Sequence, residues 1–396
     1  MKKIFFISAL LLSFVAFSQT QNKDKNKTKV KSSTNKPAVL AKNKKQETPY
    51  REKCCNWIAA VRVFKSWGFI DTTGTYIINL QFDDAESFSD GYARIKKVGK
   101  WGYVDTKGTY VINPQFDQAC DFSENLARVY KFKKWGYIDK KGMIVIDYRF
   151  AEAGDFKDGL ARVRQGTSWG VIDENGKFIV NPQFASLGEF SEDLAKARLG
   201  KEWGFVDKTG KWVVNAQFSE VKDFHDGYAR VRRGTQWGFI DRTGSYVINL
   251  QFEAVGDFYN GLASAKKMKQ WGYIDTKGTW VINPQFSEAD DFTENMAAVR
   301  KGKFWGYIDP SGVYSINLQF DEAFNFINGV ARVKKVTKWG YIDKTGKYIS
   351  NPQFDGAEDF HNNFAQVRKG TKWGFINHSG NLAINYMFDQ TGNFRK

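Results

Sequence analysis

The dipeptide Trp-Gly occurs ten times at one fixed spacing in this 396-residue chain, and successive copies lie 34 residues apart without insertion or deletion. A period of this length indicates a tandem repeat array, in which each unit buries its apolar face against its neighbours. One unit could hardly fold alone, because each large apolar side chain contributes about 1.5–3 kcal/mol, whereas ordering the backbone costs roughly 1–2 kcal/mol per residue. We therefore predict that the repeat tryptophans form the structural core of the array: Trp67, Trp101, Trp135, Trp169, Trp203, Trp237, Trp271, Trp305, Trp339 and Trp373.

The residues after each tryptophan predict a β-hairpin. Asp stands four residues after the tryptophan in nine copies, with Asn377 in the last, and Gly stands seven residues after it in every copy. Asp-x-x-Gly between two apolar runs is typical of a type I turn, which Asp caps and in which Gly takes a left-handed conformation. The segment before this turn is therefore a strand, and Thr109 to Asn113 illustrates its hairpin partner.

The second half of the repeat predicts a crossover followed by a third strand. Asn-Pro-Gln-Phe or a variant comes first, and its Pro and polar residues favour a looped crossover pinned by two buried phenylalanines, such as Phe116 and Phe122. Three residues after the second phenylalanine only Gly, Asn or Asp occurs, which indicates a left-handed backbone position. The following Leu-Ala-Arg-Val segments read as strands, with Ala and Val on one face. Arg94, Arg128, Arg162, Arg230 and Arg332 then form a broken column that we interpret as a solvated face.

These patterns predict an all-β array of ten three-stranded units over residues 54–396. An open, solenoid-like superhelix is favoured, because ten blades exceed the usual four to eight of a closed propeller. A closed, propeller-like ring is the alternative, since residues 57–61 match the third-strand columns ahead of the first tryptophan.

The N-terminal residues predict export. Residues 1–18 resemble a secretory signal peptide, with a basic start, an apolar run of Ile4 to Phe17 and a small-x-small cleavage site ending at Ser18. That run is short for a membrane span, so we expect no transmembrane segment in the mature chain. Residues 19–53 are rich in Lys and polar residues and read as a disordered linker. The expected compartment is the periplasm, the cell surface or the extracellular space.

The net charge of +16 does not by itself indicate nucleic-acid binding. Residues 1–53 hold 13 Lys and Arg against three Asp and Glu, so the repeat body is close to balanced. Nucleic-acid readers usually concentrate positive charge on one folded face. We therefore expect no specific nucleic-acid partner.

Trp-Gly-[Tyr/Phe]-Ile-Asp-x-x-Gly, followed by Val-Ile-Asn-Pro-Gln-Phe-Asp and Phe-x-x-Gly-Leu-Ala-Arg-Val, resembles the WG-repeat family of bacterial proteins. Residues 135–163 and 271–299 show the likeness well, and it extends over about 340 residues. The resemblance implies a non-enzymatic interaction module, often secreted or associated with the cell envelope, with no catalytic residues assigned.

One aromatic column offers a candidate ligand face. These rings stand nine residues after the tryptophans and would line one sheet face, where regularly spaced rings can stack on sugars or on a partner chain. The alternative is that the rings pack between neighbouring units. The column comprises Tyr76, Tyr110, Phe178, Trp212, Tyr246, Trp280, Tyr314 and Tyr348.

Other chemistry has less support. The repeated Asp column could bind Ca²⁺, but one Asp per unit does not supply six to eight converging oxygens, so turn capping is favoured and no metal or cofactor is expected. The histidines His225, His361 and His378 have no recognisable catalytic partner, and the pairing of Cys54, Cys55 and Cys120 is open.

The sequence thus predicts an exported, non-catalytic binding scaffold of the cell envelope that recognises a protein or an envelope polysaccharide through its aromatic strand faces. Two alternatives remain. One is a spacer without a ligand. The other is a glycan-active enzyme, which would need two carboxylates in one cleft.

Overall fold

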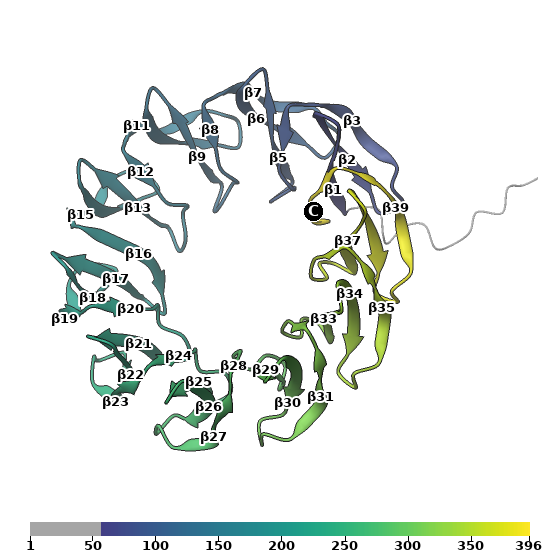
Figure 1. Ribbon diagram of the computed structural model, residues 1–396. Helices are drawn as coiled ribbons and strands as arrows, with labels where there is room; N and C mark the ends of the chain where they lie inside the picture. The colour runs from purple at the N-terminus through teal and green to yellow at the C-terminus, as the bar shows by residue number, and fades with distance from the viewer. Residues whose placement is uncertain (1–56) are drawn as a thin grey trace, which may run out of the picture. The chain divides into compact units, whose positions relative to one another are not determined.

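The chain forms a closed ring of ten four-stranded antiparallel sheets, as shown by a computed structural model that describes residues 57–396 (Figure 1). The predicted leader (residues 1–18), the predicted linker (residues 19–53) and the cysteines Cys54 and Cys55 lie outside the described residues. Each sheet is one blade of a β-propeller. We number the blades along the chain, so that blade 1 combines β1, β2 and β3 with the last strand, β40, and blade 10 consists of β36 to β39.

Two six-residue strands form the centre of nearly every blade, and the repeat tryptophan is the second residue of the later one. The earlier strands are β1 (Ile58–Val63), β5 (Tyr92–Lys97), β9 (Leu126–Lys131), β13 (Leu160–Gln165), β17 (Leu194–Leu199), β21 (Tyr228–Arg233), β25 (Leu262–Lys267), β29 (Ala297–Lys301), β33 (Val330–Lys335) and β37 (Phe364–Lys369). The later strands are β2 (Ser66–Asp71), β6 (Lys100–Asp105), β10 (Lys134–Asp139), β14 (Ser168–Asp173), β18 (Glu202–Asp207), β22 (Gln236–Asp241), β26 (Gln270–Asp275), β30 (Phe304–Ile308), β34 (Lys338–Asp343) and β38 (Lys372–Asn377).

A seven-residue strand lies at the outer rim of each blade, and a short strand, of two residues in nine blades, lies at the other edge. The outer strands are β3 (Tyr76–Phe82), β7 (Tyr110–Phe116), β11 (Ile144–Phe150), β15 (Phe178–Phe184), β19 (Trp212–Phe218), β23 (Tyr246–Phe252), β27 (Trp280–Phe286), β31 (Tyr314–Phe320), β35 (Tyr348–Phe354) and β39 (Leu382–Phe388). The short strands are β4 (Asp84–Ala85), β8 (Gln118–Ala119), β12 (Glu152–Ala153), β16 (Ser186–Ser191), β20 (Glu220–Val221), β24 (Ala254–Val255), β28 (Glu288–Ala289), β32 (Glu322–Ala323), β36 (Gly356–Ala357) and β40 (Gln390–Thr391).

The unit therefore has four strands, and the prediction of three was wrong. The Asn-Pro-Gln-Phe segment belongs to the outer strand instead of forming a looped crossover, because Pro is tolerated in an edge strand whose N–H groups need no partner on one side. A short inner strand after the first Phe, such as β8, was also missed.

The Gly that follows each tryptophan makes room for the outer strand. The pairing of the outer strand shifts register beside this Gly, as between Trp101 and Tyr103. A Cβ atom added to Gly102 would lie 2.5 Å from the carbonyl oxygen of Ile112. Trp-Gly thus combines a large side chain with a site of close backbone approach.

Both predicted turn positions are confirmed. In the Asp-x-x-Gly turn, the Asp71 carboxylate accepts hydrogen bonds from the backbone amides of Thr73 and Thr75 at 2.8 and 3.0 Å, and Gly74 has a φ of 85°. The Gly, Asn or Asp column after the second Phe is left-handed in all nine copies, for example at Asn125 with a φ of 71°. The residue before it, such as Glu124, is left-handed as well.

The open superhelix favoured from the sequence was wrong, and the alternative of a closed ring is correct. The C-terminal strand β40 pairs with β1, so that the two ends of the described chain meet in blade 1 (Figure 1). The amide of Gly392 donates to the carbonyl of Ala60 at 2.8 Å, and the amide of Arg395 donates to the carbonyl of Ile58 at 3.0 Å. Closure pairs the edge that an open array would leave exposed.

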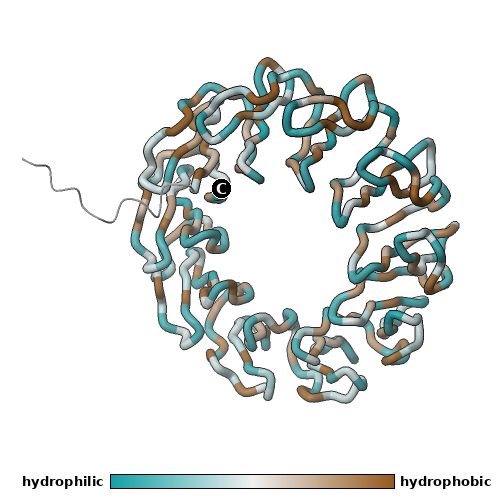
Figure 2. Tube along the Cα trace, turned by 180° about the vertical axis from the view of Figure 1, so that it is seen from behind, coloured by the Kyte–Doolittle hydropathy of each residue, from teal (hydrophilic) through white to brown (hydrophobic). Residues whose placement is uncertain are grey.

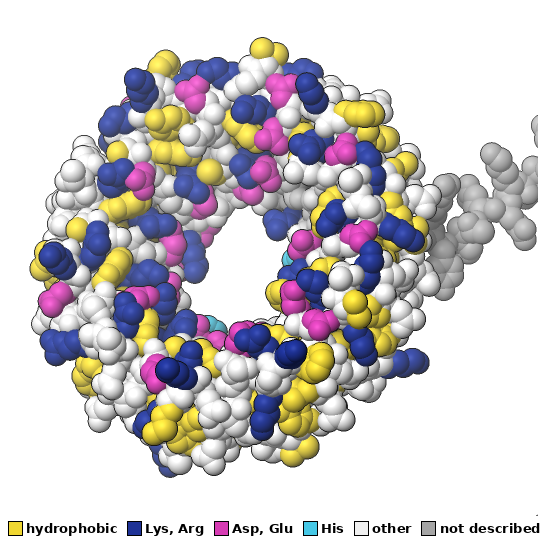
Figure 3. Space-filling model, in the orientation of Figure 1, with side chains coloured by type: hydrophobic (Ala, Val, Ile, Leu, Met, Phe, Trp, Pro, Cys, Tyr) yellow, Lys and Arg dark blue, Asp and Glu magenta, His cyan; other side chains and the backbone are white. Residues whose placement is uncertain are grey.

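The hydrophobic core lies between blades. One cluster combines Phe239 and Phe252 of blade 6 with Phe258 and Ile274 of blade 7, and the other clusters repeat this arrangement around the ring. Figure 2 shows apolar segments recurring in each blade and polar segments at many of the turns. In space-filling view the ring has an open centre, and acidic and basic side chains are distributed around the visible face (Figure 3). No helix within residues 57–396 is long and apolar enough to cross a membrane.

Ring closure can be tested at Phe394, which is buried in the cluster shared by blades 10 and 1. Replacing a buried Phe by Ala typically costs about 3–5 kcal/mol. We expect Phe394→Ala to lower the midpoint of chemical denaturation and to increase the radius of gyration measured by small-angle X-ray scattering, because the ring opens. Phe394→Leu should have a smaller effect. An unchanged midpoint in the Ala variant would show that closure does not support the other blades.

Candidate functional site

The repeat tryptophans are partly buried, and nine of the ten, all except Trp373, pack at the margin of an apolar cluster, as Trp67 does. Every one of the ten indoles also has an Arg or Lys side chain within about 6 Å of its ring centroid, such as Arg62 over Trp67 at 5.9 Å and Arg162 over Trp169 at 5.1 Å. The indoles therefore lie between the apolar core and the Arg and Lys side chains that pack on their rings.

The predicted aromatic column lies at the start of the outer strands. Seven of its eight rings pack edge-on against the outer-strand Phe of the preceding blade, as the alternative of packing between units predicts. Trp212 lies 5.6 Å from Phe184, and Tyr246 lies 6.3 Å from Phe218. The same contact is made by Tyr110, Phe178, Trp280, Tyr314 and Tyr348. The column thus occupies blade junctions and keeps part of each ring exposed.

Exposed aliphatic side chains extend this column into an apolar belt around the outside of the ring. We call it the rim belt. It comprises the eight aromatic residues of the column together with Ile77, Ile144, Val145, Ile179, Val213, Val281 and Leu382, all seven of which are exposed. The outer strands that carry it form one edge of each sheet. Exposed apolar surface that recurs on successive outer strands is typical of an interaction site.

The Arg column is not a solvated face, as the sequence had suggested, but a set of bridges between blades. Arg94 Nε lies 2.6 Å from Asp121 Oδ1 of the next blade, and Arg94 Nη1 donates to the carbonyl of Ala119. Five further pairs repeat this 27-residue spacing: Arg128–Asp155, Arg162–Glu189, Lys196–Asp223, Arg230–Asp257 and Arg332–Asp359. These acids stand directly before the second Phe of each unit, and we call them the second acidic column. The bridges neutralise their charge.

Where the cation is missing, its partner usually changes as well. Gln366 faces Asn393, with a hydrogen bond of 2.6 Å between Nε2 and Oδ1. At the same spacing Ala298 corresponds to Asn325, and Ala60 corresponds to Ser87. Ser264 is the exception, because the residue at its partner position is still an acid, Asp291. The Ser264 hydroxyl donates a hydrogen bond of 2.7 Å to the Asp291 carboxylate.

Blades 7 and 8 therefore hold an acidic cluster with reduced cationic compensation. The pKa of Asp290 is raised to about 6, mainly by burial and also by the neighbouring carboxylates of Asp291 and Glu288. Burial also raises the pKa of Asp257, against the effect of Arg230. No group of three or more His, Cys, Asp or Glu side chains arranged to hold a metal ion occurs within residues 57–396.

The carboxylates of the Asp-x-x-Gly turns are engaged with their own turns. The hydroxyl of Thr209 lowers the pKa of Asp207 by hydrogen bonding to its carboxylate, and Thr243 does the same for Asp241. Ser311 and Thr345 act likewise on Asp309 and Asp343. Turn capping thus accounts for this column.

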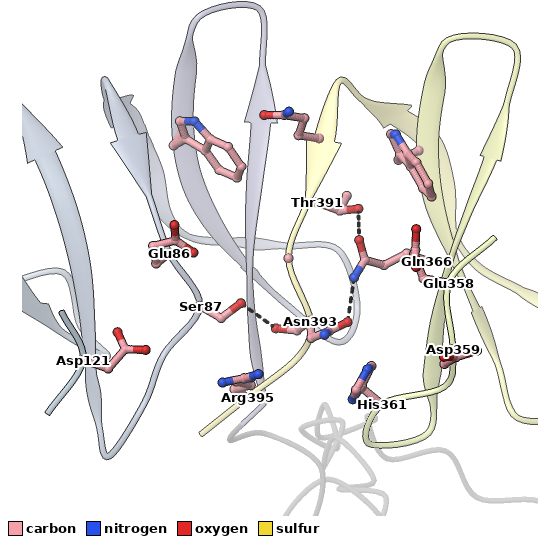
Figure 4. Close-up of a pocket in the computed structure, with 14 residues that line it drawn as sticks. Glu86, Ser87, Asp121, Glu358, Asp359, His361, Gln366, Thr391, Asn393 and Arg395 are labelled. Carbon is pink, nitrogen blue, oxygen red and sulfur yellow. Dashed lines mark hydrogen bonds between the residues drawn. The ribbon is translucent and has the colours of Figure 1, made fainter. Parts of the chain in front are cut away.

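A polar cavity of about 720 Å³ lies at the seam where the ring closes. Hydrogen bonds join Thr391 to Gln366, Gln366 to Asn393, and Ser87 to the carbonyl of Asn393 (Figure 4). We call this cavity the seam pocket. Its lining also includes Trp67, Glu86, Asp121, Glu358, Asp359, His361, Trp373, Gln390, Gly392 and Arg395.

The seam pocket exists because the cation column is interrupted on both sides of the innermost strand of blade 1. Ala60 and Gln366 stand where six of the ten blades have Arg or Lys. Asp121 and Asp359 are paired with Arg94 and Arg332. Glu86 makes no ion pair among residues 57–396. The cavity therefore offers hydrogen-bonding groups and a partly uncompensated acidic charge to a polar ligand. Sequence analysis missed it, although the change from Arg to Ala60 and Gln366 was a visible signal.

Together these features define a ten-bladed β-propeller built from one repeated unit. The family described as WG containing repeat matches the chain ten times, at residues 67–101, 101–134, 135–166, 169–203, 203–234, 237–267, 271–303, 305–335, 339–373 and 373–396. The chain belongs to this family. No protein in a comparison with curated sequences matches it significantly.

Several solved structures match the chain at low sequence identity. A eukaryotic initiation factor matches with a TM-score of 0.52 and 11% identity, over 86% of this chain and 98% of its own. PorZ, a surface component of the type-IX secretion system of Porphyromonas gingivalis, matches with a TM-score of 0.28 and 9% identity, over 83% of this chain and 53% of its own. Hsv2 of Kluyveromyces lactis matches with a TM-score of 0.36 and 10% identity, over 62% of this chain and 99% of its own. At these values the likeness to the initiation factor supports the fold alone.

The raised pKa of Asp290 gives a pH-dependent prediction. A carboxyl group whose folded pKa lies near 6, above the value near 3.9 in an unfolded chain, opposes folding increasingly as pH rises between those values. We expect Asp290→Asn to stabilise the ring at pH 7.5 by about 1 kcal/mol, after allowance for solvent screening, and to have little effect below pH 4. Thermal unfolding midpoints at the two pH values test this.

The exposed Asp226 provides a matched control, because Asn occupies its turn position in other blades, as at Asn260 and Asn328. In Asp226→Asn, the thermal unfolding midpoints at the two pH values should differ by the same amount as in wild type. A lower midpoint for Asp290→Asn at pH 7.5 would contradict the assigned effect of burial.

Proposed function

We propose that this protein is an exported, non-catalytic binding scaffold of the cell envelope that holds a protein partner on its rim belt. The observation that carries this proposal is the recurrence of exposed apolar side chains on the outer strands, from Ile77 to Leu382. Export is supported by the leader-like residues 1–18.

The contacts made by the repeated acidic residues support a binding role over a catalytic one. The carboxylates in the Asp-x-x-Gly turns cap backbone amides, and most of the second acidic column pairs with Arg or Lys of the preceding blade. These repeated polar groups therefore stabilise the scaffold, whereas the exposed apolar belt has no such structural partner on its outer side.

A protein partner fits the belt better than a polysaccharide. The rings already pack edge-on against the preceding blade, so the open part of the surface combines portions of rings with branched aliphatic side chains such as Ile179 and Val213. Stacking on sugars needs an open ring face, whereas an extended peptide can pack against mixed apolar surface.

Selection from a displayed library of random peptides tests this proposal. We expect wild type to select peptides whose affinity falls at least about tenfold in Trp212→Ala/Trp280→Ala, and in the milder Val145→Thr/Val213→Thr/Val281→Thr variant, because both remove exposed apolar area. Circular dichroism checks that the fold is kept. Trp212→Tyr/Trp280→Tyr is the control, since Tyr occupies this column in other blades. Peptides that bind all variants equally would rule out the rim belt.

The seam pocket favours a second candidate function, the binding of a soluble oligosaccharide. Its volume, its hydrogen-bonding lining and its two tryptophans, Trp67 and Trp373, suit a polyhydroxylated ligand. We expect soluble envelope oligosaccharides to raise the melting temperature of wild type but not of Glu86→Gln/His361→Ala. A shift that persists in this variant would exclude the pocket.

A further inference from the structure

Two-residue turns join the two central strands of every blade, and their first residue is left-handed in all ten copies. Gly occupies this position in five blades, at Gly166, Gly200, Gly234, Gly302 and Gly370, with φ between 60° and 67°. The other five blades have large apolar residues in the same conformation, with φ between 50° and 60°: Phe64, Val98, Phe132, Met268 and Val336. A positive φ is strained for bulky and especially for β-branched residues.

Packing does not explain these five side chains. They are 75–85% exposed, which makes them the most exposed large apolar residues in the described chain. The ring of Phe132 touches Tyr148 edge-on at 5.7 Å, and Lys372 lies 5.7 Å from the ring of Phe64. Their apolar area is open to solvent and their backbone is strained, so neither stabilises the fold.

All ten turns lie on one face of the ring, because successive antiparallel strands of a blade place their turns alternately on opposite faces. We call it the hairpin face. The Asp-x-x-Gly turns lie on the other face. Phe64, Val98 and Phe132 belong to the consecutive blades 1, 2 and 3, so three apolar tips form one arc of the hairpin face.

The hairpin face is also strongly basic. The five residues before each repeat tryptophan hold, over ten blades, 25 Lys and Arg but a single acid, Glu202. The two residues after the first Phe of each unit, which reach the same face, hold eleven Asp and Glu. The near balance of charge in the repeat body therefore conceals a separation of charge between the two faces.

Lysines flank the apolar tips directly. Lys65 follows Phe64, Lys133 follows Phe132, and Lys269 follows Met268, and all three lysines are exposed. Apolar tips that can enter a hydrocarbon layer, set among lysines that can reach phosphate groups, are the chemistry of a peripheral membrane contact.

We propose that the hairpin face docks on an anionic phospholipid bilayer, with Phe64, Val98 and Phe132 inserting between headgroups and the surrounding lysines binding lipid phosphates. Because the ten turns share one face of the ring, a planar bilayer can meet several tips at once. A nucleic acid would use aromatic rings for base stacking, but three of the five tips, Val98, Met268 and Val336, are aliphatic. This proposal does not depend on the rim belt or on the seam pocket.

Sedimentation with vesicles of phosphatidylcholine and phosphatidylglycerol in equal parts tests the proposal with the full chain. We expect wild type to bind these vesicles, to bind vesicles of phosphatidylcholine alone far more weakly, and to lose affinity at high salt. Phe64→Gly/Val98→Gly/Phe132→Gly should weaken binding at least about tenfold. Gly is the natural residue at this position in five blades, so this variant should unfold at the same temperature as wild type or higher.

Two comparisons make the result decisive. Val145→Thr/Val213→Thr/Val281→Thr removes exposed apolar area from the rim belt and should bind vesicles like wild type. Every variant keeps the Lys-rich residues 19–53, so their contribution to binding is constant. The proposal is overturned if the triple Gly variant binds anionic vesicles as tightly as wild type. It is also overturned if that variant loses affinity for a single-stranded oligonucleotide but not for vesicles.

Discussion

The structure depends on one constraint: no blade has a hydrophobic core of its own. Each apolar cluster takes side chains from two successive blades, as when Phe82 of blade 1 packs with Phe88 of blade 2. A blade at a free end would expose half a cluster, so the chain is stable only when its last residues supply the missing surface. Phe394 does this by completing the cluster with Phe375 and Phe388, and β40 supplies the strand that β1 needs.

The bridges between blades add specificity more than stability. Most of their acids are about half exposed, as Asp155 and Glu189 are, and such pairs contribute only about 0–1 kcal/mol each. Their value lies in the arrangement: a cation meets an acid, Gln366 meets Asn393, and Ala298 corresponds to Asn325. Because mismatched neighbours would bury an uncompensated charge, the pairs favour the native order of blades around the ring. At Asp291, where the cation is lost and the acid is retained, the neighbouring Asp290 has a raised pKa, because of its burial and of the carboxylates of Asp291 and Glu288.

The local structure could be read from the sequence because single residues dictate it. Asp71 and Gly74 specify a turn, and Asn125 indicates a left-handed position, by chemistry that acts within a few residues. Closure was the alternative and not the favoured arrangement, because ten blades exceed the usual number. Residues 57–61 match the third-strand columns, but their partner in β40 lies more than 300 positions away in the sequence. The Arg column was interpreted as a solvated face because Arg94 contacts Asp121 of the next blade only after the blades have packed together. The near-neutral composition likewise gave no sign that charge is separated between faces.

Comparing equivalent positions in the ten copies separates residues that the fold requires from residues that it does not require, because all ten copies form the same blade structure. Columns that all copies fill alike, such as the Phe of the outer strand or the Gly of Trp-Gly, answer a packing demand. The first residue of the hairpin turn is different: five blades fold with Gly there, so the fold does not require Phe64, Val98 or Phe132. A left-handed backbone costs a bulky residue roughly 1–2 kcal/mol relative to Gly, and a domain is stable by only about 5–15 kcal/mol. Side chains that add strain and remain in solvent therefore point outward, to a surface that the ring meets.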